Sequence, residues 1–95
     1  MKLLWTPEAS ANLDAAQDFI AQDNPAAAPR LVEAIHAAAQ RIVRFPDIGA
    51  ATEPLPLRVF QVARTPFRIY YLARHDDIVI VAVWHGARSW RSDPF

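Results

Sequence analysis

Cysteine is absent from the 95 residues of this chain, which excludes disulfide bonds and thiolate metal sites and fits a reducing compartment. Glycine occurs only as Gly49 and Gly86, so neither a phosphate-binding loop nor a dinucleotide-binding fingerprint can form. The longest strongly apolar run, Ile78–Trp84, is far shorter than the roughly 20 residues that cross a bilayer. Glu8 and Asp14 interrupt the N-terminal segment, where no secretory signal is readable. We expect one cytoplasmic domain, residues 1–95, with no cofactor and no membrane contact.

The charge is balanced, with ten basic and ten acidic side chains and a formal net charge of zero. Such a chain has no overall field that draws it toward nucleic acid. The two halves differ, because residues 1–50 carry four basic and six acidic side chains, whereas residues 51–95 carry six basic and four acidic ones. The second half is therefore the one better suited to face an anion.

A first helix is indicated by Thr6, Pro7 and Glu8, which supply an N-cap, a proline at the first helical position and an acid that the helix dipole favours. Beyond this start, apolar residues recur at steps of three and four and form one stripe: Ala9, Leu13, Ala16 and Ile20. This stripe is expected to face the core.

A second helix is indicated by Asn24–Pro25, which repeats the cap-plus-proline signature. The chain is then expected to turn through residues 22–23 and form an antiparallel helical hairpin. Pro29 would lie inside this helix, at a cost of up to about 3 kcal/mol, so we expect a kink or a start after Ala28. An apolar stripe sustains the helical period up to Pro46, which disfavours helix at the preceding residue: Leu31, Ile35, Ala38, Ile42 and Phe45.

Three strands are indicated by segments rich in Val, Ile, Tyr and Phe, at residues 57–63, 67–74 and 78–85. A loop with prolines and Gly49 precedes them, at residues 47–56. The two short connections permit only antiparallel pairing, which predicts a meander. Ile78–Trp84 is apolar on both faces, as in a central strand with the helices on one side. The other side is expected to be a shallow apolar surface that a partner covers.

The ends of the chain and its internal signatures resemble those of one protein family. They include Trp5-Thr-Pro-Glu8, Asn24–Pro25 and Val83-Trp-His-Gly-Ala-Arg88. Further matching positions are Ala27-Ala28 with Arg30, Phe45-Pro46 with Gly49, Leu57-Arg58 and Pro66-Phe-Arg-Ile-Tyr-Tyr71. In this order and spacing they resemble the RelE/ParE toxins of type II toxin–antitoxin systems, over nearly the whole chain. The resemblance implies an α+β fold, with an N-terminal strand and a two-helix antiparallel hairpin packed on a C-terminal antiparallel β meander.

What the resemblance implies about function is a growth-arresting toxin, of the kind that stabilises plasmids, held in a heteromeric complex with a cognate antitoxin. The antitoxin's C-terminal segment would wrap around the domain, which agrees with coupled folding of a disordered partner. Family members either cleave mRNA on the ribosome, like RelE, or inhibit DNA gyrase, like ParE. A member that has lost its toxicity and serves only as a binding partner is a further alternative.

A nuclease would need a base, an acid and cations around the phosphate. Arg64, Arg68, His85 and Arg88 are the candidates, and residues 54–74 contain no acidic side chain. Strand alternation gives Arg58 and Arg68 no guaranteed common face, so charge solvated at a strand edge is the alternative interpretation. His85 is either an acid–base group or a hydrogen-bonded residue at a strand end.

Metal binding is not expected, since His36, His75 and His85 lack the spacing of metal ligands. Tyr70 and Tyr71 lie within a predicted strand, so at least one of them belongs to the core rather than to a catalytic site.

The C-terminal tail favours the gyrase branch. Endonuclease members typically have a tyrosine near the C terminus, but this tail has Trp90 and Phe95 and no tyrosine after Tyr71. Ribosome-binding members also tend to be strongly basic, whereas this chain is neutral. Trp90 either packs back on a helix or contacts a target, because Trp and Arg are enriched at interface hot spots. The predicted target-binding residues are Arg58, Arg68, His85, Arg88 and Trp90.

Overall fold

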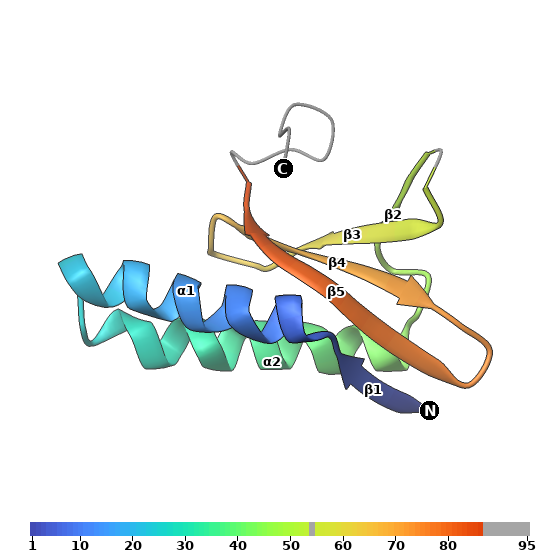
Figure 1. The fold of residues 1–95 in the computed structure, drawn as a ribbon, viewed down its shortest axis with the longest axis horizontal. Coiled ribbons are helices and arrows are strands. Elements are labelled where there is room, and N and C mark those ends of the chain that lie inside the picture. The colour runs from blue at the N-terminus through green and yellow to red at the C-terminus, as the bar shows by residue number, and fades with distance from the viewer. Residues whose placement is uncertain (54, 87–95) are drawn as a thin grey trace.

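A five-stranded sheet with two helices on one face forms the fold in the computed structural model, which describes residues 1–53 and 55–86 (Figure 1). The elements in chain order are β1 (Lys2–Trp5), α1 (Pro7–Asp23), α2 (Ala27–Arg44), β2 (Ala50–Thr52), β3 (Leu57–Gln61), β4 (Phe67–Ala73) and β5 (Asp77–His85). The strand order is β1-β5-β4-β3-β2, with β1 parallel to β5 and every other pair antiparallel. The predicted α+β class, the N-terminal strand, the hairpin and the meander are confirmed.

The first helix begins where the sequence predicts. The Thr6 side-chain oxygen accepts a hydrogen bond from the Ala9 N–H at 3.0 Å, and Pro7 is the first helical residue. The same hydroxyl donates to the Val81 carbonyl at 3.0 Å, which fixes the start of α1 to β5. The predicted turn through residues 22–23 is wrong, because α1 continues to Asp23 and Asn24 caps its C terminus.

The start of the second helix differs from the prediction. Asn24 and Pro25 lie in the connection, and α2 begins at Ala27 after Ala26, which makes no side-chain capping bond. Pro29 is thereby the third helical residue, within the first turn, where backbone N–H groups have no intrahelical acceptor. Its missing N–H removes no hydrogen bond there, so the displaced start avoids the penalty of an interior proline. The end of α2 at Arg44, with Phe45 as its cap, agrees with the prediction.

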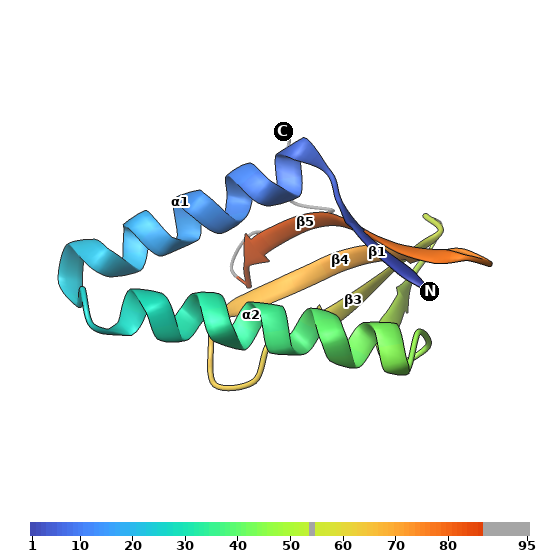
Figure 2. The same cartoon turned by 90° about the horizontal axis from the view of Figure 1, so that it is seen from below.

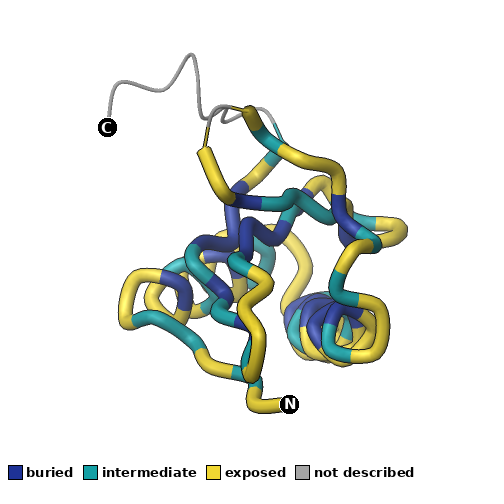
Figure 3. Tube along the Cα trace, turned by 90° about the vertical axis from the view of Figure 1, so that its right-hand side faces the viewer, coloured by how far each residue is buried: buried dark blue, intermediate teal, exposed yellow. Residues whose placement is uncertain are grey.

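The main core lies between the helices and the sheet, and both predicted helical stripes contribute to it, except that Phe45 at the end of the second stripe is 53% exposed. Figure 2 shows α1 and α2 side by side along one face of the strands, and Figure 3 shows buried residues both on the strands and on the helix seen end-on. The fully enclosed members include Ala9, Ile35 and Ile42 from the helices and Ile69, Tyr71, Ile78 and Ile80 from the sheet. At about 2 kcal/mol for each large apolar side chain, this burial is the main stabilising contribution.

A β-bulge in β5 decides which side chains reach this core. Tyr71 pairs with Ile80, but Tyr70 pairs with Ala82, so Val81 is an extra residue. The strict alternation that starts at Ile78 is therefore inverted beyond the bulge. Val83 joins the core beneath the helices, while Ala82 and Trp84 lie on the opposite face with Tyr70.

Three apolar side chains on the opposite face of the sheet are buried rather than openly exposed. Tyr70, Ala82 and Trp84 are 4%, 1% and 3% exposed, and the Tyr70 and Trp84 rings are 5.2 Å apart. The chain itself buries these side chains, so the prediction of a shallow apolar surface that needs a partner to cover it is wrong at these positions. Both tyrosines are core residues, which confirms the assignment of at least one of them.

Part of the predicted loop at residues 47–56 is the strand β2, which pairs with β3. The buried hydroxyl of Tyr71 fixes the turn before it, donating to the Pro46 carbonyl at 2.7 Å and accepting from the Gly49 N–H at 2.9 Å. Arg58 adds a bond from its guanidinium to the Gly49 carbonyl at 2.7 Å. The end of α2 is therefore bound to the sheet by polar contacts as well as by packing.

The same contacts predict a pH dependence of stability. Burial raises the pKa of the Tyr71 hydroxyl above its ordinary value, and this exceeds the opposing effect of its bond with the Gly49 N–H. Since the folded state disfavours the phenolate, this contribution is complete below the unfolded pKa of about 10 and is lost as the pH rises through the folded value. The free energies of unfolding of wild type and Tyr71→Phe, measured between pH 8 and 11, should therefore converge above about pH 10. A constant difference would contradict this account.

Candidate functional site

Among the predicted target-binding residues, Arg58 has a structural role. It pairs with Tyr71 on the side of the sheet that the helices cover. Its guanidinium donates to the carbonyls of Asp47 and Gly49 at 3.3 and 2.7 Å and lies 3.5 Å from the Asp47 carboxylate. These contacts occupy Arg58 in holding the loop after α2, so the prediction that it binds a target has no support in its surroundings.

Arg68 lies on the opposite face of the sheet. It pairs with Trp84 across β5 and with Gln61 across β3, and its Nε donates to Gln61 Oε1 at 3.2 Å. Arg58 and Arg68 therefore point to different faces, as the alternation of the strands allowed. A Cβ built at Gly86 would be 3.6 Å from Arg68 Nε. Arg68 is thus placed at the outer end of β5, beside the residue where the described part of the chain ends.

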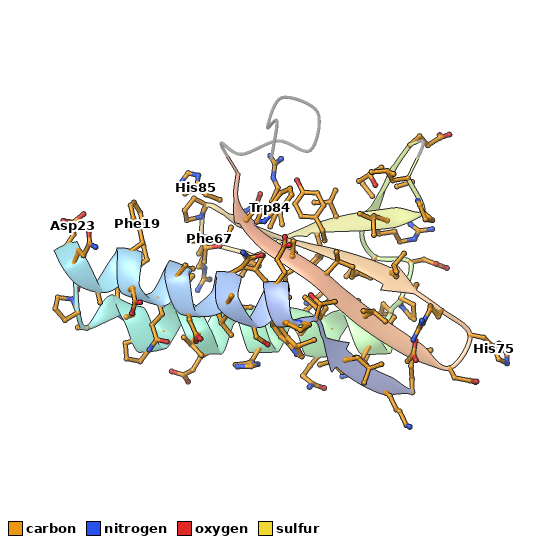
Figure 4. All side chains as sticks on the ribbon, in the orientation of Figure 1. Phe19, Asp23, Phe67, His75, Trp84 and His85 are labelled. Carbon is orange, nitrogen blue, oxygen red and sulfur yellow. The ribbon has the colours of Figure 1, made fainter. Side chains whose placement is uncertain are left out.

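His85 is exposed at the end of β5, on the side of the sheet that carries the helices. Its ring packs edge-on against the ring of Phe67, the residue that it pairs with on β4 (Figure 4). The two ring centroids are 5.5 Å apart, and the angle between the ring planes is 76°. His85 pairs with Phe67 and shares its face of the sheet. Arg68 follows Phe67 on the same strand, so Arg68 and His85 lie on opposite faces. The pair does not form the compact acid–base set that the endonuclease alternative requires.

Of the remaining candidates, only Arg64 belongs to the described residues. Arg64 lies in the turn between β3 and β4 with a positive φ of 64°, and Arg88 and Trp90 lie outside the described residues. The three histidines lie on different parts of the fold. His36 is on α2 and packs against Trp5 of β1, whereas His75 lies in the turn before β5, at the opposite end of that strand from His85 (Figure 4). Within residues 1–53 and 55–86, no three His, Cys, Asp or Glu side chains could hold a metal ion.

Sequence reasoning did not find a groove of about 930 Å³ between α2 and the β3–β4 turn. Its apolar lining includes Leu31, Ala34 and Ala38 on one wall and Phe60 and Val62 on the other. Arginine side chains border it at positions 30, 41 and 64, and no acidic residue lines it. The signal in the sequence was a second helical stripe on α2 made of alanine and arginine, beside the more apolar core stripe.

The comparisons with known proteins agree with this architecture. The family model described as the ParE toxin of the type II toxin–antitoxin system parDE matches residues 3–90. Toxin RelE2 of Caulobacter vibrioides is 32% identical over 87 residues, which cover 92% of this chain and 97% of that protein. The putative toxin Y4kP of Sinorhizobium fredii is 29% identical over 89 residues, 94% and 92% of the two chains.

Two solved structures are similar as well. A chain of the chromosomal ParDE toxin–antitoxin system from P. aeruginosa superposes with a TM-score of 0.79 and 26% identity over 90% of this chain and 95% of that one. The YoeB/ParE toxin from Agrobacterium tumefaciens, at 16% identity, a TM-score of 0.60 and 90% and 98% coverage, shares the fold. The fold is that of the toxins of type II toxin–antitoxin systems. This chain belongs to the ParE toxin family within that class.

No helix in the described ranges is long and apolar enough to span a membrane.

Proposed function

We propose that this chain acts in the cytoplasm, is neutralised there by a cognate antitoxin, and poisons DNA gyrase by protein–protein contact when it is free. The observation that carries this proposal is the separation of Arg68 and His85 onto opposite faces of the sheet. General acid–base cleavage needs its groups within hydrogen-bond reach of one scissile phosphate. A toxin that acts by binding has no such requirement.

The surroundings of the tyrosines and the overall charge support the same choice. Tyr70 and Tyr71 are 4% and 0% exposed, and the Tyr71 hydroxyl is committed to Pro46 and Gly49. Neither phenol is available to act on a substrate. The net charge of zero gives the chain no overall field that would draw it to an RNA-lined site.

The test is expression of the chain without its antitoxin, with thymidine, uridine and methionine incorporation followed over the first minutes. Early loss of thymidine incorporation, together with inhibition of supercoiling by purified gyrase, is the expected result. Early loss of methionine incorporation would show a ribosome-dependent endoribonuclease acting on mRNA instead. Normal growth would show a family member without toxicity.

Two substitutions sharpen this test. Trp90→Ala should weaken gyrase inhibition by about tenfold or more, as truncation of an interface hot spot does. His85→Ala should weaken inhibition less than Trp90→Ala does, because His85 would contribute only a binding contact and a binding toxin needs no acid–base group. The reverse pattern, with activity kept in Trp90→Ala and lost in His85→Ala, would contradict the gyrase proposal. Circular dichroism of each purified variant controls for misfolding.

A further inference from the structure

The outer half of β5 has α1, rather than another strand, along one of its edges. β1 pairs with β5 only as far as Ile80, because the chain turns into α1 after Trp5. Beyond that point α1 runs beside β5 and takes the place of the missing strand (Figure 2). The end of β5 that carries His85 therefore depends on α1 for its polar partners on this side.

Thr6, the N-cap of α1, binds two successive carbonyls of β5. Its N–H donates to the Ile80 carbonyl at 3.0 Å, and its hydroxyl donates to the Val81 carbonyl at 3.0 Å. In a regular strand successive carbonyls point to opposite sides, so one residue beside the strand cannot bind both. The two contacts are possible because Val81 is the extra residue of the bulge. Thr6 thus clamps the bulge at its centre.

Asn12, farther along α1, holds the strand just after the bulge. Its side-chain oxygen accepts a hydrogen bond from the Val83 N–H at 3.0 Å, although the two residues are 71 positions apart. Asn12 is half-buried, whereas the other amide side chains of α1, Gln17 and Gln22, are exposed. Helix propensity does not favour asparagine inside a helix. The contribution of Asn12 is therefore this tertiary contact to β5.

The sequence of β5 does not choose its register by itself. Residues 78–84 are apolar at every position, so a shift by one residue would still place apolar side chains on both faces. Without the bulge, Phe67 would face Trp84 instead of His85, and Trp84 would turn toward the helices. His85 would then lie on the face of the sheet that carries Arg68. The interactions that exclude this alternative come from α1.

We infer that Thr6 and Asn12 form a register lock, which holds β5 in its bulged register and so keeps His85 and Arg68 on opposite faces of the sheet. The inference goes beyond the proposed target and does not depend on it, because it concerns the free chain. The atoms that act are the hydroxyl of Thr6 and the side-chain oxygen of Asn12. Removal of both should let the outer half of β5 shift by one residue along β4, with Val81 returned to the regular ladder.

Nuclear magnetic resonance of the free chain reads the register directly, through nuclear Overhauser contacts between Hα protons of β4 and β5. In the wild type such a contact should join Phe67 to His85. In the double variant Thr6→Val, Asn12→Leu, this contact should be lost and replaced by one between Phe67 and Trp84. Retention of the Phe67–His85 contact in a folded double variant would overturn the inference.

Amide hydrogen exchange distinguishes a shift of register from the simple loss of one hydrogen bond. In the bulged register the Val83 N–H points to α1, so the next N–H, that of Trp84, points to β4. A shift by one residue exchanges the two directions. The exchange of the Trp84 amide should therefore become faster by about tenfold or more, in Asn12→Leu as in the double variant. Faster exchange at Val83 alone, with Trp84 still protected, would overturn the inference.

Conservative variants separate the register lock from the packing of α1. Asn12→Asp keeps an acceptor and Thr6→Ser keeps a hydroxyl, so both should give the wild-type contacts and exchange rates. Gln17→Ala is the matched control, since it removes an amide from the exposed side of α1 and should also leave the register unchanged. A shifted register in Asn12→Asp or in Gln17→Ala would overturn the inference, because the effect would not follow the hydrogen-bonding atoms. If the double variant does not fold, Asn12→Leu alone decides between these outcomes.

Discussion

Replacing Gly49 by alanine is expected to lower the free energy of unfolding by about 3 kcal/mol, a large fraction of the stability of a small domain. A Cβ at this position would lie 2.8 Å from both Cε1 and the hydroxyl of Tyr71 and 2.9 Å from the Val59 carbonyl oxygen. Neither neighbour can move aside easily, since Tyr71 is completely buried and Val59 belongs to β3. Any shift of the Tyr71 ring also weakens its bonds to Pro46 and Gly49, and a buried polar group left unpaired costs about 1–3 kcal/mol.

Urea unfolding followed by tryptophan fluorescence measures this effect. Gly86→Ala is the matched control, because there the nearest atom to a Cβ is the Pro66 carbonyl oxygen at 3.0 Å and the next belong to the flexible Arg68 side chain. It should cost clearly less than Gly49→Ala. In a double-mutant cycle, Tyr71→Phe should reduce the cost of Gly49→Ala, since one of the close contacts is removed. Equal costs for the two glycine variants would contradict the tight packing around Gly49.

Local sequence signals predicted the start of a helix correctly where the cap, the proline and the apolar stripe all agreed. The Thr6–Pro7 start of α1 was predictable because the cap and the proline agree with the apolar stripe that follows. The same signature at Asn24–Pro25 failed, since a helix that started there would have enclosed Pro29 in its interior. The chain instead starts α2 at Ala27 without a side-chain cap. Keeping Pro29 within the first turn of α2 thus outweighs the local capping preference.

The arrangement in the sheet was less predictable, because it depends on pairing. Residues 50–52 have little strand character of their own, and β2 exists through its hydrogen bonds to β3. The bulge at Val81 inverts the faces of β5, and a segment that is apolar at every position gives no sign of such an inversion. The side of the sheet on which His85 lies therefore could not be derived from alternation.

The candidate site shows the same limit. Arginine at position 58 suggested an anion-binding group, but its partners are carbonyls in a loop that only the fold brings near. The groove was missed because its two walls are separated in sequence and most apolar residues of the α2 wall are alanines, which carry little signal alone. Arg30 and Arg41 belong to one helical stripe, and their spacing could have suggested a paired contact.

Replacing Ile35 by alanine is expected to lower the free energy of unfolding by about 3 kcal/mol, within the range of about 2–5 kcal/mol for such truncations. Ile35 is 0% exposed and belongs to the core cluster beneath the helices. The surrounding side chains come from helices and strands alike, so they relax only partly into the cavity. For a domain of this size the melting temperature should fall by roughly 12–24 °C.

Phe19→Ala on α1 is the control, because it removes a larger side chain that is 55% exposed and should change the stability by less than about 1 kcal/mol. Both variants are measured by thermal unfolding of the free chain. Equal destabilisation by the two variants would show that α2 does not pack through Ile35.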